Sequence, residues 1–210
     1  MSNIITAKVE LVGTRPLLFH HFGEDAIPLQ KQETTGVAGN DPWTWAKTVL
    51  ITKDGQLYVL PTQVFSSIRD GARHIKQKRG SIQPLVVATL QVTDDIILVD
   101  RFLPEDAREF VRSRGKVGNP LEVLTQDHAE SVYLDIRSTR NPSTKARNVT
   151  YRVAVSSGWQ MQASLEWDKT VVSRDQMHSC LIQAGGLEGI GSGRKIGMGR
   201  FIVASFSVNE

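Results

Sequence analysis

Cysteine is nearly absent from the sequence, which has a single thiol, Cys180, in 210 residues. One cysteine excludes a disulfide within the chain and any zinc site that needs several thiolates. Cys180 lies in a patterned apolar stretch, so we expect it to pack in the core rather than to act as a nucleophile. The sequence therefore predicts neither a metal nor another cofactor.

Long hydrophobic runs are also missing, and no segment approaches the roughly 20 consecutive apolar residues that cross a bilayer. The first residues, MSNI, lack the charged region followed by an apolar region that marks a secretory signal. Together with the lone cysteine, these absences predict a cytoplasmic protein that has no membrane partner.

Acidic residues are sparse in three stretches that are rich in Lys and Arg. These stretches are residues 69–79, 137–152 and 194–200, although the formal net charge is only +3. Clustered cations create a local field that attracts polyanions. A solvated basic surface without a ligand is the alternative that charge alone leaves open. With 40% hydrophobic and 22% charged residues, the composition is that of a globular protein.

Alternating and helical spacings of apolar residues divide much of the chain into strands and helices. We expect strands at residues 4–12, 149–156, 159–167 and 200–208, and helices at 62–78 and 173–184. The expected local signals are a hairpin at Ser157-Gly158, an N-cap at Ser173 and a helix end at Gly185-Gly186. This order predicts an α+β fold of the ferredoxin-like (RRM-like) βαββαβ type. Residues 1–210 then form one domain with insertions at about 14–45 and 80–148, the second of which contains two apolar strands within 84–99.

A glycine-rich basic loop separates the second helix from the last strand. Five of the thirteen residues from 189 to 201 are glycine, and Arg194, Lys195 and Arg200 add positive charge. Glycines let a backbone approach an anion closely and turn its amide groups toward it. A Walker loop or a dinucleotide fingerprint would follow a strand and open a helix, whereas here a helix precedes and a strand follows. The loop therefore indicates phosphate binding by some other motif, or a purely structural turn.

The same loop resembles that of the RAMP superfamily of CRISPR-associated proteins. Its family pattern is Gly-hydrophobic-Gly, five residues that include a Lys or Arg, and Gly-hydrophobic-Gly, which residues 189–199 match throughout. Residues 60–73 more loosely resemble a Pro-x-Ser-Ser-hydrophobic-x-Gly segment of backbone subunits, and residues 16–20 are similar to the opening of uncharacterised phage-encoded proteins. The resemblance implies a non-catalytic subunit that binds guide RNA, contacts other subunits of a ribonucleoprotein complex in antiviral defence, and forms a homo-oligomer along the RNA.

Our binding hypothesis has Arg194, Lys195 and Arg200 contacting the phosphates of a single-stranded nucleic acid, either RNA or DNA. Backbone contacts of this kind give little sequence specificity and a strong dependence on salt. The residues expected to shape or extend the site are Gly189, Gly191, Gly193, Gly197, Gly199, Arg69, Arg73, Lys76, Arg137, Arg140, Lys145 and Arg147.

Two adjacent histidines, His20 and His21, keep an enzymatic alternative open. The resemblance implies that such a histidine could be the general acid or base of a metal-independent endoribonuclease that processes guide RNA. Asp25 has only the position of the aspartate found in target-cleaving backbone subunits, and His20, His21 and Glu24 lack the spacing that fixes a metal. The third alternative is a phage-encoded single-strand-binding or interaction protein whose basic loops meet an acidic protein.

Overall fold

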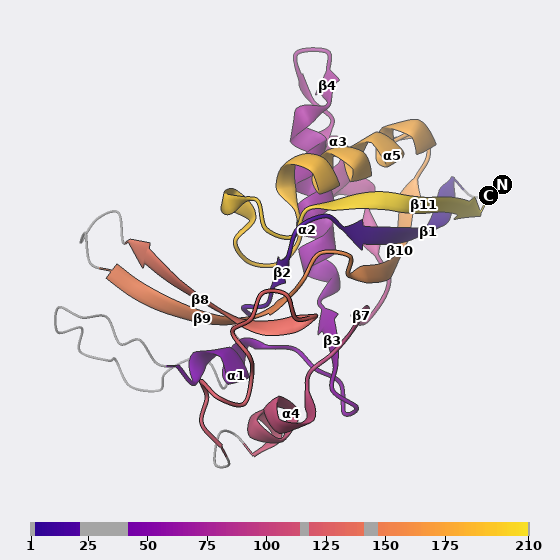
Figure 1. Cartoon of the computed structure of the whole chain (residues 1–210). Coiled ribbons are helices and arrows are strands. Elements are labelled where there is room, and N and C mark those ends of the chain that lie inside the picture. The colour runs from indigo at the N-terminus through magenta and orange to yellow at the C-terminus, as the bar shows by residue number, and fades with distance from the viewer. Residues whose placement is uncertain (1–2, 22–41, 114–117, 141–146, 210) are drawn as a thin grey trace, which may run out of the picture. The chain divides into compact units, whose positions relative to one another are not determined.

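The computed structural model describes residues 3–21, 42–113, 118–140 and 147–209 (Figure 1). The chain folds into two compact units, which we describe separately. Unit 1 contains Met1–Leu17, Tyr58–Asp100 and Ser157–Glu210, and unit 2 contains Leu18–Leu57 and Arg101–Ser156. The chain thus leaves unit 1 and returns to it twice.

Unit 1 is built on an antiparallel sheet in which the N-terminal strand β1 (Ile4–Gly13) lies between an edge strand and the middle strand. The strand order is β11 (Phe201–Asn209), β1, β10 (Gln160–Asp168), β7 (Ile97–Phe102) and β3 (Gln56–Val59), and β6 (Gln91–Val92) also pairs with β10. Residues of β1 alternate between buried and exposed, as expected of a strand that covers a core with one face. The predicted strands at 4–12, 159–167 and 200–208 are confirmed.

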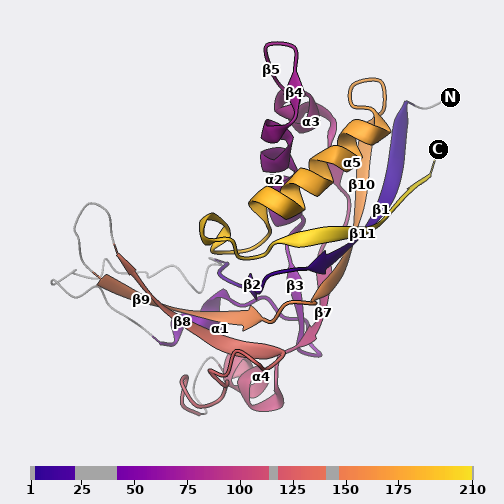
Figure 2. The same cartoon turned by 45° about the horizontal axis from the view of Figure 1, so that its top comes forward.

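Helices α2 (Pro61–Gly71) and α5 (Arg174–Gln183) contact each other and lie on the same side of this sheet (Figure 2). The order β1, α2, β6 and β7, β10, α5, β11 is that of an α+β fold with a ferredoxin-like core, as the sequence predicts. Helix α5 begins at the expected N-cap, because the Ser173 hydroxyl accepts from the Gln176 amide and the Gln176 side chain accepts from the Ser173 amide. None of the helices in the described residues is long and apolar enough to cross a membrane.

Helix α5 ends at Gln183, which confirms the predicted helix at 173–184, but Gly185 and Gly186 do not end it as left-handed residues, which corrects that part of the prediction. These residues belong to a π-helical turn, η3 (Ala184–Glu188), that continues directly from α5. A Cβ atom at Gly185 would lie 2.2 Å from the Phe201 carbonyl oxygen, so this glycine serves a close approach of η3 to β11. The turn ends at Gly189, whose φ of +80° and ψ of 177° favour glycine.

The predicted hairpin of residues 149–156 and 159–167 is wrong. Strand β9 (Arg147–Val155) pairs with β8 (Val132–Arg140) and with β2 (Leu17–Leu18), whereas β10 pairs with β1. Gly158 has the positive φ of a turn residue, but its amide donates to the Gly13 carbonyl over 2.7 Å. Two alternating segments joined by Ser-Gly are typical of a hairpin, and the local pattern carries no sign that the chain passes there from one unit to the other.

Besides β1, the strands that pair with β10 come from residues 91–102. The two strands predicted within 84–99 correspond to the short β6 and to β7, which lie on either side of Asp94 and Asp95, and the Asp94 carboxylate accepts from the Ser164 amide over 2.6 Å. The preceding residues, expected to be extended, form helix α3 (Gln83–Thr89), in which Pro84 occupies the first turn.

Helix α2 is shorter than the 62–78 predicted. Pro61 occupies its first turn, and after Gly71 the chain forms a 3₁₀ turn, η2 (Ala72–His74). The basic residues that follow, expected in the last helical turn, instead form a ribbon of β4 (Lys76–Gln77) and β5 (Gly80–Ser81). The helical spacing of apolar residues ends at Ile75, and the run of cations beyond it has no apolar face to hold a helix.

Unit 2 consists of the sheet β2-β9-β8 with helices α1 (Thr44–Thr48) and α4 (Glu105–Arg112). Trp43 and Trp45 both stack on Phe110 of α4, at ring-centroid distances of 5.0 and 5.2 Å. The Trp45 indole nitrogen donates to the Pro120 carbonyl over 2.9 Å, so the buried ring has its polar atom satisfied. Trp45 therefore forms part of the core of unit 2, and the half-buried Trp43 stacks on the same phenylalanine.

Gly71 allows α2 to lie against the end of α5, because a Cβ atom there would be 2.5 Å from the Ala184 amide nitrogen. We predict that Gly71→Ala lowers the free energy of unfolding by about 1–3 kcal/mol, although alanine alone favours a helix. Chemical denaturation measures the change. Gly80→Ala is the matched control, since nothing lies within 4 Å of its Cβ position, and an equal loss in both variants would contradict the close-packing explanation.

Candidate nucleic-acid interface

The two ends of the glycine-rich loop are hydrogen-bonded to each other and to the rest of unit 1. The Ile190 amide donates to the Gly199 carbonyl over 2.9 Å, and the Gly199 amide donates to the Pro16 carbonyl over 2.7 Å. A Cβ atom on Gly199 would lie 1.8 Å from the Ile190 carbonyl oxygen, so only glycine fits this crossing. These amides are used inside the protein and are not free for an anion.

The middle of the loop forms a 3₁₀ turn, η4 (Arg194–Ile196), between two glycines in the left-handed conformation. Gly193 and Gly197 have φ values of +73° and +83°, and the Gly197 amide donates to the Arg194 carbonyl over 3.0 Å. The glycines thus close a tight turn that carries the side chains of Arg194 and Lys195.

A buried carboxylate on α2, Asp70, gathers three arginines at this turn. Arg69 Nε donates to Asp70 Oδ1 over 2.9 Å, Arg194 Nη2 donates to Asp70 Oδ2 over 2.7 Å, and Arg73 also donates to Oδ1. The Asp70 side chain is only 8% exposed. Burial alone would raise the pKa of this carboxyl, but the hydrogen bonds from Arg69, Arg194 and Arg73 together hold the pKa well below its usual range.

A second carboxylate, Glu188 of η3, extends this network. Its Oε1 atom lies 2.8 Å from His74 Nε2, and its Oε2 atom accepts from Arg194 Nη2 over 3.3 Å. Burial opposes the charge of Glu188, yet the contacts with His74 and Arg194 lower its pKa. Arg194 is therefore held between Asp70 and Glu188, which ties the glycine-rich loop to α2 and η3.

A pocket of about 480 Å³ lies beside this network. It is lined by Asp70, Arg73, Leu187, Glu188, Arg194, Lys195 and Arg200. Lys195 is exposed and has no ion-pair partner among the described residues, while Arg200 Nη1 is buried without a hydrogen-bond acceptor. Four cations face two carboxylates here, so the pocket keeps an excess of positive charge and an unmatched donor, which is what an anion requires.

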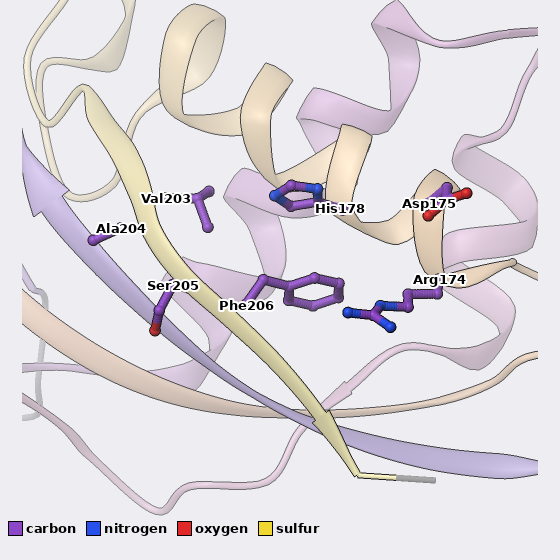
Figure 3. A pocket seen from close by; sticks show the side chains of 7 residues that line it. All are labelled: Arg174, Asp175, His178, Val203, Ala204, Ser205 and Phe206. Atoms are coloured by element: carbon purple, nitrogen blue, oxygen red, sulfur yellow. The ribbon is translucent and has the colours of Figure 1, made fainter.

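A second pocket, of about 380 Å³, lies in the same unit between α5 and β11 (Figure 3). It is lined by Arg174, Asp175, His178, Val203, Ala204, Ser205 and Phe206. The rings of His178 and Phe206 stack on each other, with centroids 5.0 Å apart and planes 4° apart. Its single cation, Arg174, adjoins a carboxylate, Asp175, so this pocket lacks the charge excess of the first.

The remaining cations of the binding hypothesis lie elsewhere. Lys76 is exposed on the β4–β5 ribbon of unit 1. In unit 2, Arg137 donates through Nε to both carboxylate oxygens of the buried Asp135, over 2.7 and 2.8 Å. Arg140 and Arg147 are paired residues at one end of the β8–β9 ladder, and Lys145 lies outside the described residues. The structure thus brings Arg69, Arg73, Arg194, Lys195 and Arg200 together in unit 1 and places the second basic stretch in unit 2.

The two histidines of the enzymatic alternative belong to unit 2. His20 follows β2, next to Phe19, whose amide donates to the Val153 carbonyl over 2.8 Å. Burial and the neighbouring Arg152 lower the pKa of His20. The amide of His21 donates to the Thr48 carbonyl over 2.8 Å. Glu24 and Asp25 lie outside the described residues, among which no group of three or more metal-ligating side chains occurs.

Sequence reasoning missed Asp70 and Glu188, the two acids that organise the basic residues. Asp70 lies between Arg69 and Arg73 and shares the buried side of α2 with Ser67 and Gly71. The sequence did contain a signal for Asp70: a carboxylate at a buried helical position with arginines on both sides. A buried charge needs partners, and the arginines could supply them. The partner from residue 194 could not be read from the sequence.

We predict that Asp70→Asn lowers the free energy of unfolding by about 3 kcal/mol at neutral pH, because it leaves three guanidinium groups without their shared carboxylate. The folded-state pKa of Asp70 is lowered, so its contribution is full above the ordinary pKa near 4 and declines as the pH falls below it. The difference between wild type and variant should therefore shrink in acid. Denaturation at a series of pH values measures it.

Asp95→Asn is the control for this measurement, because Asp95 is exposed and has no hydrogen-bond partner among the described residues. A difference between wild type and Asp70→Asn that stays constant into acid would contradict the role given to the ionised carboxylate.

No protein-family model and no curated protein sequence matches this chain. Among solved structures, it aligns with a chain described as "Cryo-EM structure of the Type III-B Cmr-beta bound to cognate target RNA", at a TM-score of 0.46 and 9% identity. The alignment covers 99% of this chain and 61% of the other, so this chain spans less than two thirds of that protein's length.

Proposed function

We propose that unit 1 binds the phosphate backbone of single-stranded RNA in the basic pocket beside the glycine-rich loop, without cleaving it. The observation that carries the proposal is the buried Nη1 atom of Arg200, a charged donor without an acceptor on the pocket wall. Nearly all buried hydrogen-bond donors in proteins have an acceptor, and an anionic ligand would supply the acceptor that Arg200 lacks. Lys195, exposed on the same wall, adds a second charge for a neighbouring phosphate.

The arginines of the pocket have different roles in this proposal. Arg194 and Arg73 are neutralised by Asp70, so they position the glycine-rich loop and contribute little charge to RNA. Lys195 and Arg200 contact the phosphates directly. Binding through phosphates releases counterions, which makes affinity depend on salt and hardly on base sequence.

The wider assembly is also a proposal. The match of residues 189–199 to the RAMP loop pattern supports a backbone-type subunit of a CRISPR-type ribonucleoprotein complex, which oligomerises along its guide RNA and contacts other subunits. Arg140 and Arg147 of unit 2 lie opposite each other in the β8–β9 ladder, and Lys145 lies between them in the sequence. These three residues would extend the contact with RNA. Units 1 and 2 would then act as a single RAMP-like domain.

A metal-independent endoribonuclease is the second candidate function. It is favoured by His20, whose lowered pKa keeps the imidazole neutral at neutral pH beside the cation of Arg152. A neutral imidazole can accept a proton, and a guanidinium can bind a phosphate. We expect no cleavage of structured RNA by the wild type; cleavage that disappears in His20→Ala would establish this function in place of the first.

The binding proposal predicts that Lys195→Ala with Arg200→Ala weakens binding to a fluorescent oligouridylate and flattens its salt dependence. Each lost phosphate contact should reduce the slope of log affinity against log salt by about 0.7. Arg194→Ala should instead lower the free energy of unfolding, because its partners are Asp70 and Glu188. Fluorescence anisotropy over a range of salt concentrations measures the slope.

Lys169→Ala serves as the matched control, since this exposed lysine of unit 1 does not line the pocket. A double variant with the slope of the wild type would contradict the assigned contacts. If the wild type bound no polynucleotide even at low salt, the basic surface would belong to an interaction with an acidic protein.

A further inference from the structure

A short β ribbon follows the pocket residue Arg73 along the chain. In it, Lys76 pairs with Ser81 and Gln77 pairs with Gly80, and at its base the Ile82 amide donates to the Ile75 carbonyl over 3.0 Å. Figures 1 and 2 both show the ribbon projecting from the end of α2, away from the sheet of unit 1. Main-chain hydrogen bonds therefore hold the tip of the ribbon in place.

The tip is a two-residue loop formed by Lys78 and Arg79. Lys78 has a φ of +50° and is the one non-glycine residue with positive φ in the described part of the chain. A two-residue hairpin in which only the first loop residue has positive φ normally carries glycine at that position. A lysine there is strained, and strain of this kind is kept where the side chain has a task.

The ribbon carries positive charge that the protein does not neutralise. Lys76, Lys78 and Arg79 are all exposed, and none has an ion-pair partner among the described residues. The sequence has no acidic residue between Asp70 and Asp94. An apolar anchor is also missing from residues 76–81, whereas the centre of a protein–protein interface is usually apolar or aromatic. The chemistry of the ribbon fits a polyanion rather than a protein.

The ribbon follows the pocket closely along the chain. Arg73 lines the pocket, and β4 begins three residues later. At about 3.3 Å per residue, the two residues of each strand carry the tip roughly 7 Å beyond the base of the ribbon. We infer that the β4–β5 ribbon is a second phosphate-binding element, which contacts the backbone of the same RNA strand beyond the pocket through Lys78 and Arg79. This inference rests on the proposed function of the pocket.

Two variants separate the charge of the tip from its strain. Lys78→Gly removes one cation and relieves the strain, so it should raise the midpoint of thermal unfolding and flatten the salt dependence of RNA binding by about 0.7 in slope. Lys78→Gln with Arg79→Gln removes both cations at the same backbone geometry. This double variant should flatten the slope of log affinity against log salt by about 1.4. It should not raise the midpoint of thermal unfolding, because the strain remains. Lys169→Ala is the control.

Oligouridylates of increasing length distinguish this inference from the function of the pocket. The ribbon variants should match the wild type on the shortest oligomers that bind and lose affinity only on longer ones, whereas Lys195→Ala with Arg200→Ala should lose affinity at every length. Wild-type salt slopes in the ribbon variants on long oligomers would overturn the inference and leave the pocket standing. A thermal unfolding midpoint of Lys78→Gly below that of the wild type would show that Lys78 is not strained. If the wild type bound no RNA at any length, the proposed function itself would be overturned.

Discussion

One buried carboxylate organises the basic side of unit 1. Asp70 would be costly to bury alone, and it is stable there because three guanidinium groups surround it: Arg69 on the same helix, Arg73 in the turn that follows the helix, and Arg194 in a loop far along the chain. Through Arg194 the carboxylate fixes the glycine-rich loop, and through Glu188 and His74 the same contacts reach the turn that continues α5. The positions of Lys195 and Arg200 on the pocket wall follow from this anchoring.

This arrangement separates two kinds of cation that look alike in a sequence. Arginines that pair with a buried acid are structural, because their charge is matched inside the protein and their geometry is fixed by bidentate or shared hydrogen bonds. Cations without such partners keep their charge available to a ligand. The glycines likewise divide: Gly189 and Gly199 close the loop, and Gly193 and Gly197 shape the turn that displays the side chains. The loop is thus a hydrogen-bonded structural element whose outer surface is the candidate interface.

The sequence was sufficient to predict the α+β, ferredoxin-like order, the cap at Ser173 and three of the strands of the main sheet, because those signals are local. The sequence-based prediction was wrong at residues 149–167, where two alternating segments resemble a hairpin but belong to different sheets. It was also wrong about the role of Gly185, where the close approach of β11 requires glycine inside a helical turn. The basic character of the site was visible in the sequence. The pairing of Arg194 with Asp70 was not, because it joins residues 124 positions apart.

The position of β1 between β10 and β11 has a consequence for synthesis of the chain. Both partners of the first strand are encoded near the other end, so β1 leaves the ribosome long before any strand that can pair with it on either side. Its alternating apolar residues must stay exposed or be sheltered during that interval, and unit 1 can close only when the last strand arrives. Unit 1 therefore completes its fold late, and truncation near the C-terminus would remove β11, an entire edge of its sheet.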